Sequence, residues 1–582
     1  MIETLILLTI ALPWLGALVV WRVGDDRPTV QNAVAVGFAL ASGVAALGML
    51  PLAKPGTALS FAVGGAFGDF TFVADGLGVF LAVVATVVGS LAVIFSVDYM
   101  RGEAQLGRYY ALVLFFIGAM AGLVLSSNLL LVFVFWEITA LCSYALISFN
   151  NDDPKAVAGG IKALIMTQLG GIGLLAGALL VYAHTGSYDI NVFMQQAHTL
   201  PAALLTVMAF GFLIAAAAKS AQFPFQTWLP DAMEAPTPIS ALIHAATMVN
   251  AGVYLLARFY PAFEAVPGWR TAVVVVGLLS AFLSAIMALV ATDLKRVLAY
   301  STVSQLGYMV YAIGAGGVFA SQFHLLSHSV FKALLFLGAG AVIHAAGTRD
   351  MRQMGALGKH MPFVRNVFII GALALAGIPI LNGFWSKELV LEAGLAHGPL
   401  WAYLVMLIGA GLTACYTLRC VWMVFFGAPA THHHVHDAGK AMRIALAPLA
   451  FGVLTTWLLA GAFGHLLAET LPFHEMEAET TLSVIEEVVT APATLVALAV
   501  VGLGLLAWWQ RGVLKGLLYA LRAVARLAED SFGFEAVNRG VVRWTQSVAE
   551  ALRPTQTGIL SWNVLGILAA LIVVALILVL GA

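Results

Sequence analysis

Long apolar runs, separated by short polar stretches, dominate the hydropathy pattern of this chain. A helix needs roughly 20 apolar residues to cross a hydrocarbon core about 30 Å thick. Lipid offers no hydrogen-bond partner to the backbone, so each such run is predicted to be a transmembrane helix. We count about sixteen of these runs. Their approximate limits are residues 2–21, 30–50, 77–98, 110–126, 128–149, 158–183, 203–226, 236–258, 270–291, 297–314, 318–346, 365–386, 400–426, 442–466, 491–508 and 559–581.

Residues 512–552 follow a different pattern, because leucines recur at helical spacing with basic residues between them. This pattern is typical of an amphipathic helix that lies along a membrane surface. At 1.5 Å per residue, about 40 residues reach roughly 60 Å. Weak helix formers at Ser531–Glu535 predict a bend. Two interpretations stay open: a lateral brace against neighbouring subunits on the inside face, or a peripheral helix that packs on its own bundle.

The distribution of lysine and arginine predicts the orientation of the chain. With the N-terminus outside, thirteen of these residues fall in inside loops and three (Lys54, Arg258 and Arg270) in outside loops. Membrane proteins carry an excess of positive charge in their inside loops. We therefore predict that the N-terminus lies outside. The acidic segment around residues 475–487 then lies outside.

Two predicted spans carry helix breakers beside a lysine: Lys219 precedes Pro224, and the stretch 377–383 precedes Lys387. Broken helices at corresponding positions of two halves indicate a transport site between internal repeats. We therefore expect an all-α polytopic membrane protein with two inverted five-helix repeats. The expected organisation is 1–109 (N-terminal helices), 110–258 (first repeat), 270–426 (second repeat), 441–508 (C-terminal helices), 512–552 (lateral helix) and 559–581 (last span).

Composition excludes several classes of function. Hydrophobic residues make up 61% of the 582 residues and charged residues 10%, and the formal net charge of −1 gives no field for nucleic acid. The three cysteines form no CxxC pair, and there is neither GxGxxG after a strand nor GxxxxGK[ST]. We therefore expect no iron–sulfur cluster, metal or nucleotide site in this chain. The first twenty residues lack a basic n-region and a cleavage site, so we expect a retained span there.

Ionisable side chains inside predicted spans are the main functional signal, because a buried charge costs several kcal/mol. Glu137 lies in an apolar run without a neighbouring charge, and Lys219 lies at a helix break. Desolvation can make a lysine lose its proton near neutral pH, which suits proton transfer. The alternatives are a neutral glutamic acid that joins two helices and a lysine that extends to an interface.

A second group lies farther along the chain. His324, His328 and Lys332 are spaced i, i+4 and i+8, so they share one helix face over about 12 Å. With intervening water such a stripe can relay protons, and His244 is a further candidate. The alternatives are polar residues that only hold helices together and, for His244, an ordinary core histidine. A zinc site would need more ligands than the two histidines supply.

Lys387 and Glu388 follow the second break, where an interfacial salt bridge is the alternative to a role in transport. We expect residues 293–296 to form a solvated inside loop. The histidines of 432–436 resemble a metal site in composition, and a solvated loop is the simpler interpretation.

Four segments combine polar residues with helix breakers: KSAQFPFQTWLPDAMEAPTPISALIHAATMVNAGVYLLAR (219–258), DLKRVLAYSTVSQLGYM (293–309), HLLSHSVFKALLFLGAGAVIH (324–344) and GFWSKE (383–388). Through them the chain resembles the antiporter-like subunits of respiratory complex I, most of all the L subunit, the counterpart of mitochondrial subunit 5. Mrp-type sodium/proton antiporters share these motifs. Gly171 and Asn250 depart from the pattern of complex I, and a Gly-Gly at 170–171 resembles the Mrp type.

The resemblance implies that this chain translocates protons while redox chemistry occurs in partner subunits, which would hold NAD, FMN, iron–sulfur clusters and quinone. It implies a Glu137–Lys219 pair, a relay through His244 and the stripe 324–332, and a terminal lysine at Lys387. The expected partners are other membrane subunits, contacted partly through 512–552, and lipids. The alternatives are an Mrp-type antiporter subunit, the membrane module of a hydrogenase or inorganic-carbon uptake complex, or a structural scaffold.

Overall fold

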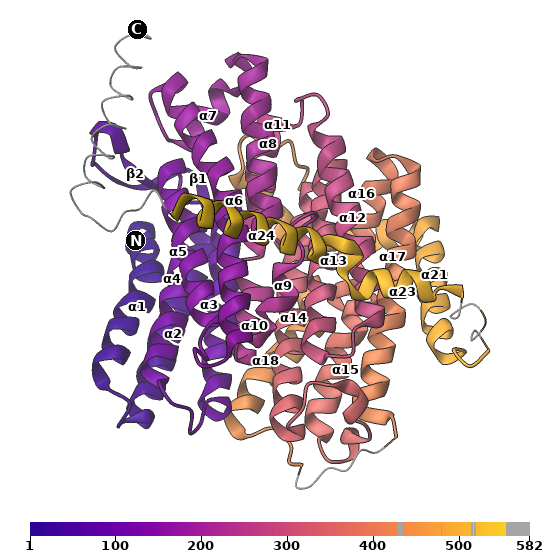
Figure 1. Ribbon diagram of the computed structural model, residues 1–582. Helices are drawn as coiled ribbons and strands as arrows, with labels where there is room; N and C mark the ends of the chain where they lie inside the picture. Colours follow the sequence, from indigo (N-terminus) through magenta and orange to yellow (C-terminus); the bar gives the residue numbers. More distant parts are fainter. Residues whose placement is uncertain (429–434, 479, 514–515, 517–519, 554–582) are drawn as a thin grey trace. The chain divides into compact units, whose positions relative to one another are not determined.

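The structure, a computed structural model, describes residues 1–428, 435–478, 480–513, 516 and 520–553. The chain forms two units, Met1–Ala525 and Arg526–Ala582. The first unit is a bundle of helices joined by short loops (Figure 1). It contains every candidate proton-transfer residue predicted from the sequence.

Thirteen helical segments of the described residues are long and apolar enough to cross a membrane. The chain is therefore a polytopic integral membrane protein. These segments are α1 (Ile2–Val23), α2 (Pro28–Met49, prolonged to Leu52), α3 (Gly76–Tyr99), α4 (Leu106–Leu125), α5 (Leu129–Ile147), α6 (Pro154–Thr185), α8 (Ala202–Lys219), α10 (Thr237–Ala241) with α11 (Asn250–Phe263), α12 (Trp269–Val290), α14 (Val318–Ala346), α17 (Leu400–Val421, prolonged to Phe426), α18 (Lys440–Thr455) with α19 (Ala460–Thr470), and α21 (Pro492–Trp509).

Two further predicted spans are helical but do not meet that criterion. The span predicted at 297–314 is the more polar helix α13 (Leu294–Ala315). The span predicted at 365–386 is divided into α15 (Pro362–Ala376) and α16 (Asn382–His397). The last predicted span, 559–581, lies outside the described residues, so the count of sixteen stays a prediction.

Short polar signals set the ends of many helices. A side-chain oxygen of Asp75, Asn128, Asp153 and Asp293 accepts a hydrogen bond from the first turn of α3, α5, α6 and α13, respectively. Each such cap satisfies one of the free N–H groups at the start of a helix. These capping signals can be read from the sequence.

Both helix breaks occur close to where the sequence predicts them. Helix α8 ends at Lys219, and the chain continues through α9 (Trp228–Asp231) before it turns back along α10. The second break separates α15 from α16 at residues 377–381. Lys387 therefore lies inside α16, whereas Lys219 is the last residue of its helix.

The N-terminal region departs from a purely helical fold. Strands β1 (Lys54–Phe61) and β2 (Phe70–Ala74) form an antiparallel hairpin between α2 and α3. Two short helices, α7 (Ile190–Gln196) and α20 (Thr481–Thr490), also lie in segments predicted to be loops. In the loop before α5, Ser126 forms a β-bridge with Phe72 of β2, and Asn128 forms one with Asp189, just before α7. These segments therefore lie at the same end of the bundle. We call it the outer end, after the predicted orientation.

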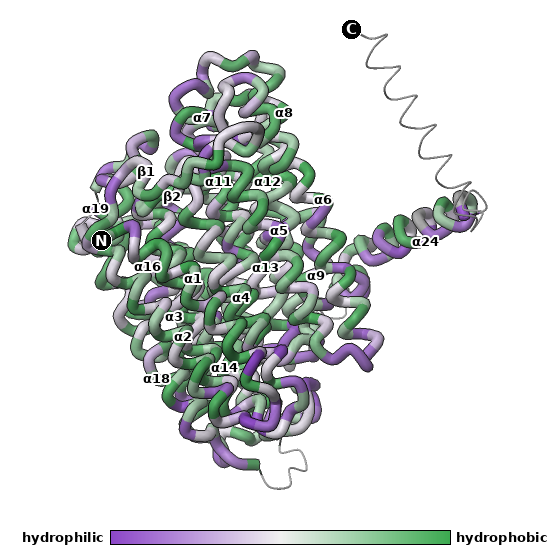
Figure 2. The backbone as a smooth tube through the Cα atoms, turned by 90° about the vertical axis from the view of Figure 1, so that its left-hand side faces the viewer, coloured by the Kyte–Doolittle hydropathy of each residue, from purple (hydrophilic) through white to green (hydrophobic). Residues whose placement is uncertain are grey.

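Apolar segments run through the body of the bundle, and more polar segments gather toward its two ends (Figure 2). Small residues let neighbouring helices approach closely. A Cβ at Gly277 of α12 would lie 2.7 Å from the Gly307 carbonyl of α13. Close backbone approach of this kind supports helix packing where lipid removes the hydrophobic driving force.

The region predicted as one amphipathic helix at 512–552 contains α23 (Arg522–Glu529) and α24 (Phe534–Leu552). Between them Phe532 and Gly533 have positive φ angles of 55° and 82°. The helix is thus interrupted where the sequence predicts a bend. Residues 514–515 and 517–519 lie outside the described residues, and contact with a partner stays a prediction.

Candidate functional site

Lys219 lies deep in the first half of the bundle and is fully buried at the end of α8. Its Nζ donates a hydrogen bond of 2.6 Å to the carbonyl of Trp136 on α5. The same Nζ lies 4.9 Å from the centroid of the Trp136 ring. A buried ammonium needs such partners because desolvation penalises its charge.

Glu137 follows Trp136 on α5, so the lysine contacts the backbone beside the glutamate rather than its carboxylate. Glu137 and Lys219 interact electrostatically. Among the described residues, both carboxylate oxygens of Glu137 are buried and lack a hydrogen-bond partner. The hydrogen bond of Lys219 thus goes to the backbone, and no ion pair between Lys219 and Glu137 is present among the described residues.

Gly171 on α6 packs against the Glu137 carboxylate. A Cβ at Gly171 would lie 2.4 Å from Glu137 Oε1, closer than real Cβ atoms approach a neighbour. The glycine therefore provides the space that the carboxylate occupies. The sequence shows Gly171 as a departure from the pattern of complex I, and only the structure reveals what it contacts.

His244 lies in a π-helical turn between α10 and α11 and is completely buried. Its ring packs 4.6 Å from the ring of Phe336 on α14. Within the described part of the chain, neither ring nitrogen has a hydrogen-bond partner. π-helical turns concentrate at functional sites.

The stripe on α14, whose spacing predicts a shared helix face, is buried throughout. The rings of His324 and His328 lie 6.4 Å apart. Lys332 Nζ donates to the carbonyl of Leu298, at 3.1 Å, and to the hydroxyl of Ser301, both on α13. The stripe thus faces α13 rather than lipid.

His324 connects the stripe to the second half of the bundle. Its Nδ1 lies 2.9 Å from the hydroxyl of Ser386, and its Nε2 lies 3.2 Å from Gln305 Oε1. Ser386 immediately precedes Lys387 on α16. Ser386 belongs to the GFWSKE motif of the sequence, but the motif gives no sign of this contact.

Lys387 is 2% exposed, and its Nζ donates a hydrogen bond of 2.7 Å to the carbonyl of Leu375. That carbonyl belongs to the last turn of α15, across the helix break. Glu388 is 6% exposed. Both residues are therefore interior groups, which argues against the alternative of an interfacial salt bridge.

The candidate residues Glu137, Lys219, His244, His324, His328, Lys332, Lys387 and Glu388 are together called the central row. Buried polar atoms without hydrogen-bond partners accompany them. In the described residues they include both nitrogens of His244 and His328 and the amide oxygens of Asn250, Gln322 and Asn382. Buried polar groups normally have partners, and ordered water supplies many of them. The row therefore has the polarity that internal water requires.

The position of Lys295 shows that one prediction was wrong. Residues 293–296 were expected to form a solvated loop, yet Lys295 is the second residue of α13, is 2% exposed and donates a hydrogen bond of 2.6 Å to the Ala235 carbonyl. It also interacts electrostatically with His244. The sequence does not separate it from the neighbouring Arg296, because both follow the Asp293 cap and only packing buries one of them.

The position of Arg258 shows that a second prediction was wrong. It was assigned to an outside loop, but it lies in α11 and forms a buried ion pair with Asp75 at the start of α3. The two residues are 183 positions apart in the chain. Their contact has no signal in a single sequence.

The fold and the buried row define a polytopic membrane protein with titratable side chains in its interior. Two family models match the chain: "NADH:quinone oxidoreductase/Mrp antiporter, TM" over residues 126–413, and "NADH-Ubiquinone oxidoreductase (complex I), chain 5 N-terminus" over residues 61–110. The chain belongs to the antiporter-like subunits of the complex I and Mrp family, of the L or chain 5 type.

Curated relatives agree. NAD(P)H-quinone oxidoreductase chain 5 of Picosynechococcus sp. is 41% identical over 442 residues, 69% of this chain and 66% of the relative. The chloroplastic subunit 5 of Manihot esculenta is 41% identical over 390 residues, 64% of this chain and 51% of the relative. The chain thus spans about half to two thirds of the length of these relatives.

Solved structures show the same fold. The chain matches the Mrp complex from Dietzia sp. with a TM-score of 0.82 and 28% identity, over 99% of this chain and 63% of that one. It matches an archaeal membrane-bound sulfane sulfur reductase with a TM-score of 0.71 and 25% identity, over 83% of this chain and 99% of that one.

Proposed function

We propose that this chain is the proton-translocating, antiporter-like membrane subunit of an NADH:quinone oxidoreductase of the complex I type. The observation that carries the proposal is the set of buried titratable side chains inside the bundle: Lys219, His244, His324, His328, Lys332, Lys387 and Glu388 are buried, and so are the carboxylate oxygens of Glu137. Interior ionisable groups are costly in a membrane and mark ion pathways.

The first step of the proposed mechanism occurs at Lys219 and Glu137. At 4 Å and an effective dielectric constant of 20, two unit charges attract each other by about 4 kcal/mol. Closing or opening this pair therefore changes how tightly Lys219 holds its proton. Because the two side chains come from different helices, a movement of α8 against α5 would change the distance between them.

The proton then moves along the row. His244 and the stripe of His324, His328 and Lys332 supply titratable groups, and water completes the hydrogen bonds between them. Ser386 links His324 to the helix that carries Lys387. Lys387 and Glu388 are the proposed terminal groups before release at the outer side.

Redox chemistry belongs to partner subunits in this proposal. Those subunits would hold NAD, FMN, iron–sulfur clusters and quinone, and other membrane subunits would contact this chain partly through residues 512–552. The relatives carry the name of such an oxidoreductase. The proposed location is a bacterial plasma membrane, with the N-terminus outside and the helices of 512–552 on the inside face.

Lys219→Ala tests the proposal. In membrane vesicles that carry the native assembly, this variant should abolish redox-driven proton translocation while the chain still co-purifies with its partners. Lys155→Ala is the matched control, because Lys155 is exposed at the inner end of α6. Unchanged proton translocation per electron in Lys219→Ala would falsify the proposal.

A subunit of an Mrp-type sodium/proton antiporter is the second candidate, favoured by a structural match over 99% of this chain. Sodium-dependent proton exchange in vesicles without an electron donor would support it. Proton translocation that requires an electron donor and ignores sodium would exclude it.

A further inference from the structure

Helix α11 carries a polar stripe that leads from the central row to the outer end of the bundle. Asn250, Tyr254 and Arg258 are spaced i, i+4 and i+8, so they share one face over about 12 Å. Asn250 Nδ2 lies 3.4 Å from the hydroxyl of Ser329, the residue after His328. Asn250 Oδ1 is buried and, in the described structure, has no partner.

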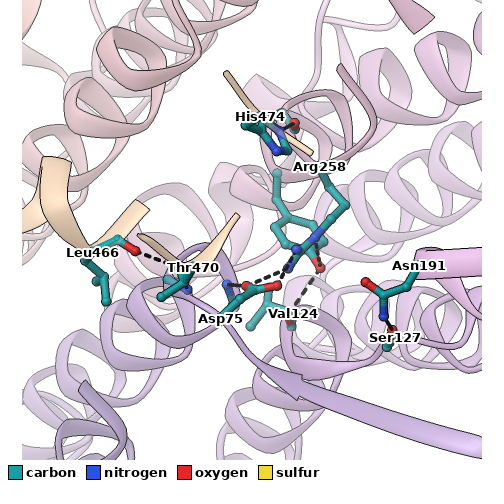
Figure 3. A network of polar contacts seen from close by, with 12 residues as sticks. Asp75, Val124, Ser127, Asn191, Arg258, Leu466, Thr470 and His474 are labelled. Carbon is teal, nitrogen blue, oxygen red and sulfur yellow. Dashed lines mark hydrogen bonds and ion pairs between the residues drawn. The ribbon is translucent and has the colours of Figure 1, made fainter. Parts of the chain in front are cut away.

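At its outer end the stripe meets a buried ion pair (Figure 3). The guanidinium of Arg258 contacts both carboxylate oxygens of Asp75, at 2.5 and 2.9 Å. Asp75 Oδ1 also accepts 2.8 Å from the backbone N–H of Gly78, as the cap of α3. The side chains of Arg258 and Asp75 are 9% and 7% exposed, respectively.

The same guanidinium also donates a hydrogen bond to the hydroxyl of Tyr254. Arg258 Nε donates 3.3 Å to that hydroxyl, which itself donates 3.2 Å to the carbonyl of Val124 at the end of α4. His474, in the loop after α19, donates from Nε2 to the carbonyl of Ala257, 2.8 Å away. The His474 side chain is partly covered and lies beside Arg258 (Figure 3).

This arrangement interrupts proton transfer along the stripe. A chain of hydrogen-bonded groups that passes protons is called a proton wire. A wire needs groups that accept one proton and donate another, as water, hydroxyl and imidazole do. Arginine has five donors and no acceptor, and it does not lose its proton in proteins. Its donors bond to the Asp75 carboxylate and to the Tyr254 hydroxyl.

We propose that the Asp75–Arg258 pair seals the outer end of the α11 stripe, so that protons from the central row do not escape beside the first half of the bundle. Protons would then leave only past Lys387. This inference rests on the proposed proton translocation and adds a location where the path is closed.

The test is passive proton flux across vesicles that carry the native assembly, measured with a pH-sensitive dye under an imposed potential and without electron donor. The double variant Asp75→Asn/Arg258→Gln keeps a capping side chain at 75 but leaves a polar space that water can enter. It should leak protons several-fold faster than the unaltered assembly. Asp75→Asn/Arg258→Met leaves an apolar space, which stays dry, and should remain sealed.

Two further variants locate the leak. Adding Asn250→Leu to the Gln double variant should restore a low flux, because it interrupts the stripe. Asp350→Asn/Arg352→Gln makes the same two substitutions at an exposed ion pair and should not leak. A Gln variant as tight as the unaltered assembly, or a leak that persists with Asn250→Leu, overturns the proposal.

The two proposals fail differently. If Lys219→Ala leaves redox-driven translocation intact, the proposed function is wrong whatever the leak. If Lys219→Ala abolishes translocation but the Gln double variant stays tight, only the seal is wrong.

Discussion

The two halves of the bundle both hold a buried lysine and a glutamate, but they arrange them differently. Lys219 ends α8 and faces Glu137 on α5, a different helix. Lys387 and Glu388 are consecutive residues on α16. Both lysines donate to a backbone carbonyl, that of Trp136 in the first half and that of Leu375 in the second.

Because of this difference, the distance between the two side chains can change in the first pair but not in the second. Two helices can slide or tilt, so the distance between Lys219 and Glu137 can change. Consecutive residues on one helix project about 100° apart, and the helix itself determines their separation. We infer that the first half supplies the gated step and the second half a constant terminal group.

The largest effect should come from removing the partner of the gated pair. Glu137→Gln keeps the shape of the side chain but removes its charge, so Lys219 loses the group that controls its proton. Redox-driven translocation should fall at least roughly tenfold, about 1.4 kcal/mol in the barrier. The matched variant Glu388→Gln should reduce it less, and equal losses in the two variants would remove the distinction between the halves.

A smaller effect is expected at Gly171. In Gly171→Ala the new Cβ would lie 2.4 Å from Glu137 Oε1, so the carboxylate must move. Translocation should decrease several-fold while the chain still assembles, because overpacking costs about 1–3 kcal/mol. Gly37→Ala, where a Cβ meets nothing within 4 Å, is the control. An unchanged rate in Gly171→Ala would mean that the position of the carboxylate is not critical.

The smallest effect should come from Ser386→Ala, which removes the hydroxyl next to His324. One neutral hydrogen bond contributes about 1 kcal/mol, so translocation should slow by roughly fivefold or less. Stopped-flow measurement of proton uptake and release would place the delay after uptake. A delay in uptake instead would show that Ser386 does not connect the stripe to the second half.

Much of the fold was predictable because membrane helices obey local rules. Apolar length and the breaks near Lys219 and Lys387 predict the long apolar helices that the structure confirms, whereas α7 and α20 lie in segments predicted to be loops. The hairpin of β1 and β2 was missed, because its strands are short and irregularly paired and no apolar run marks them. The predicted repeats at 110–258 and 270–426 and the roles of the site residues stay predictions.

The buried row was partly predictable for the same reason. Helical spacing alone places His324, His328 and Lys332 on one face, and an ionisable residue in an apolar run is conspicuous. Lys295 was assigned to solvent, because the sequence there looks like a loop and does not distinguish the buried Lys295 from the exposed Arg296 that follows it.

The sequence by itself determined that this chain crosses a membrane many times and that Lys219, the α14 stripe and Lys387 lie in its interior, since both follow from apolar length and helical period. Only the tertiary structure decided the partners of those residues: Gly171 against Glu137, Ser386 against His324, and Asp75 against Arg258. Such contacts join helices distant in the chain, and the packing of the whole bundle, rather than any local pattern, sets their distances.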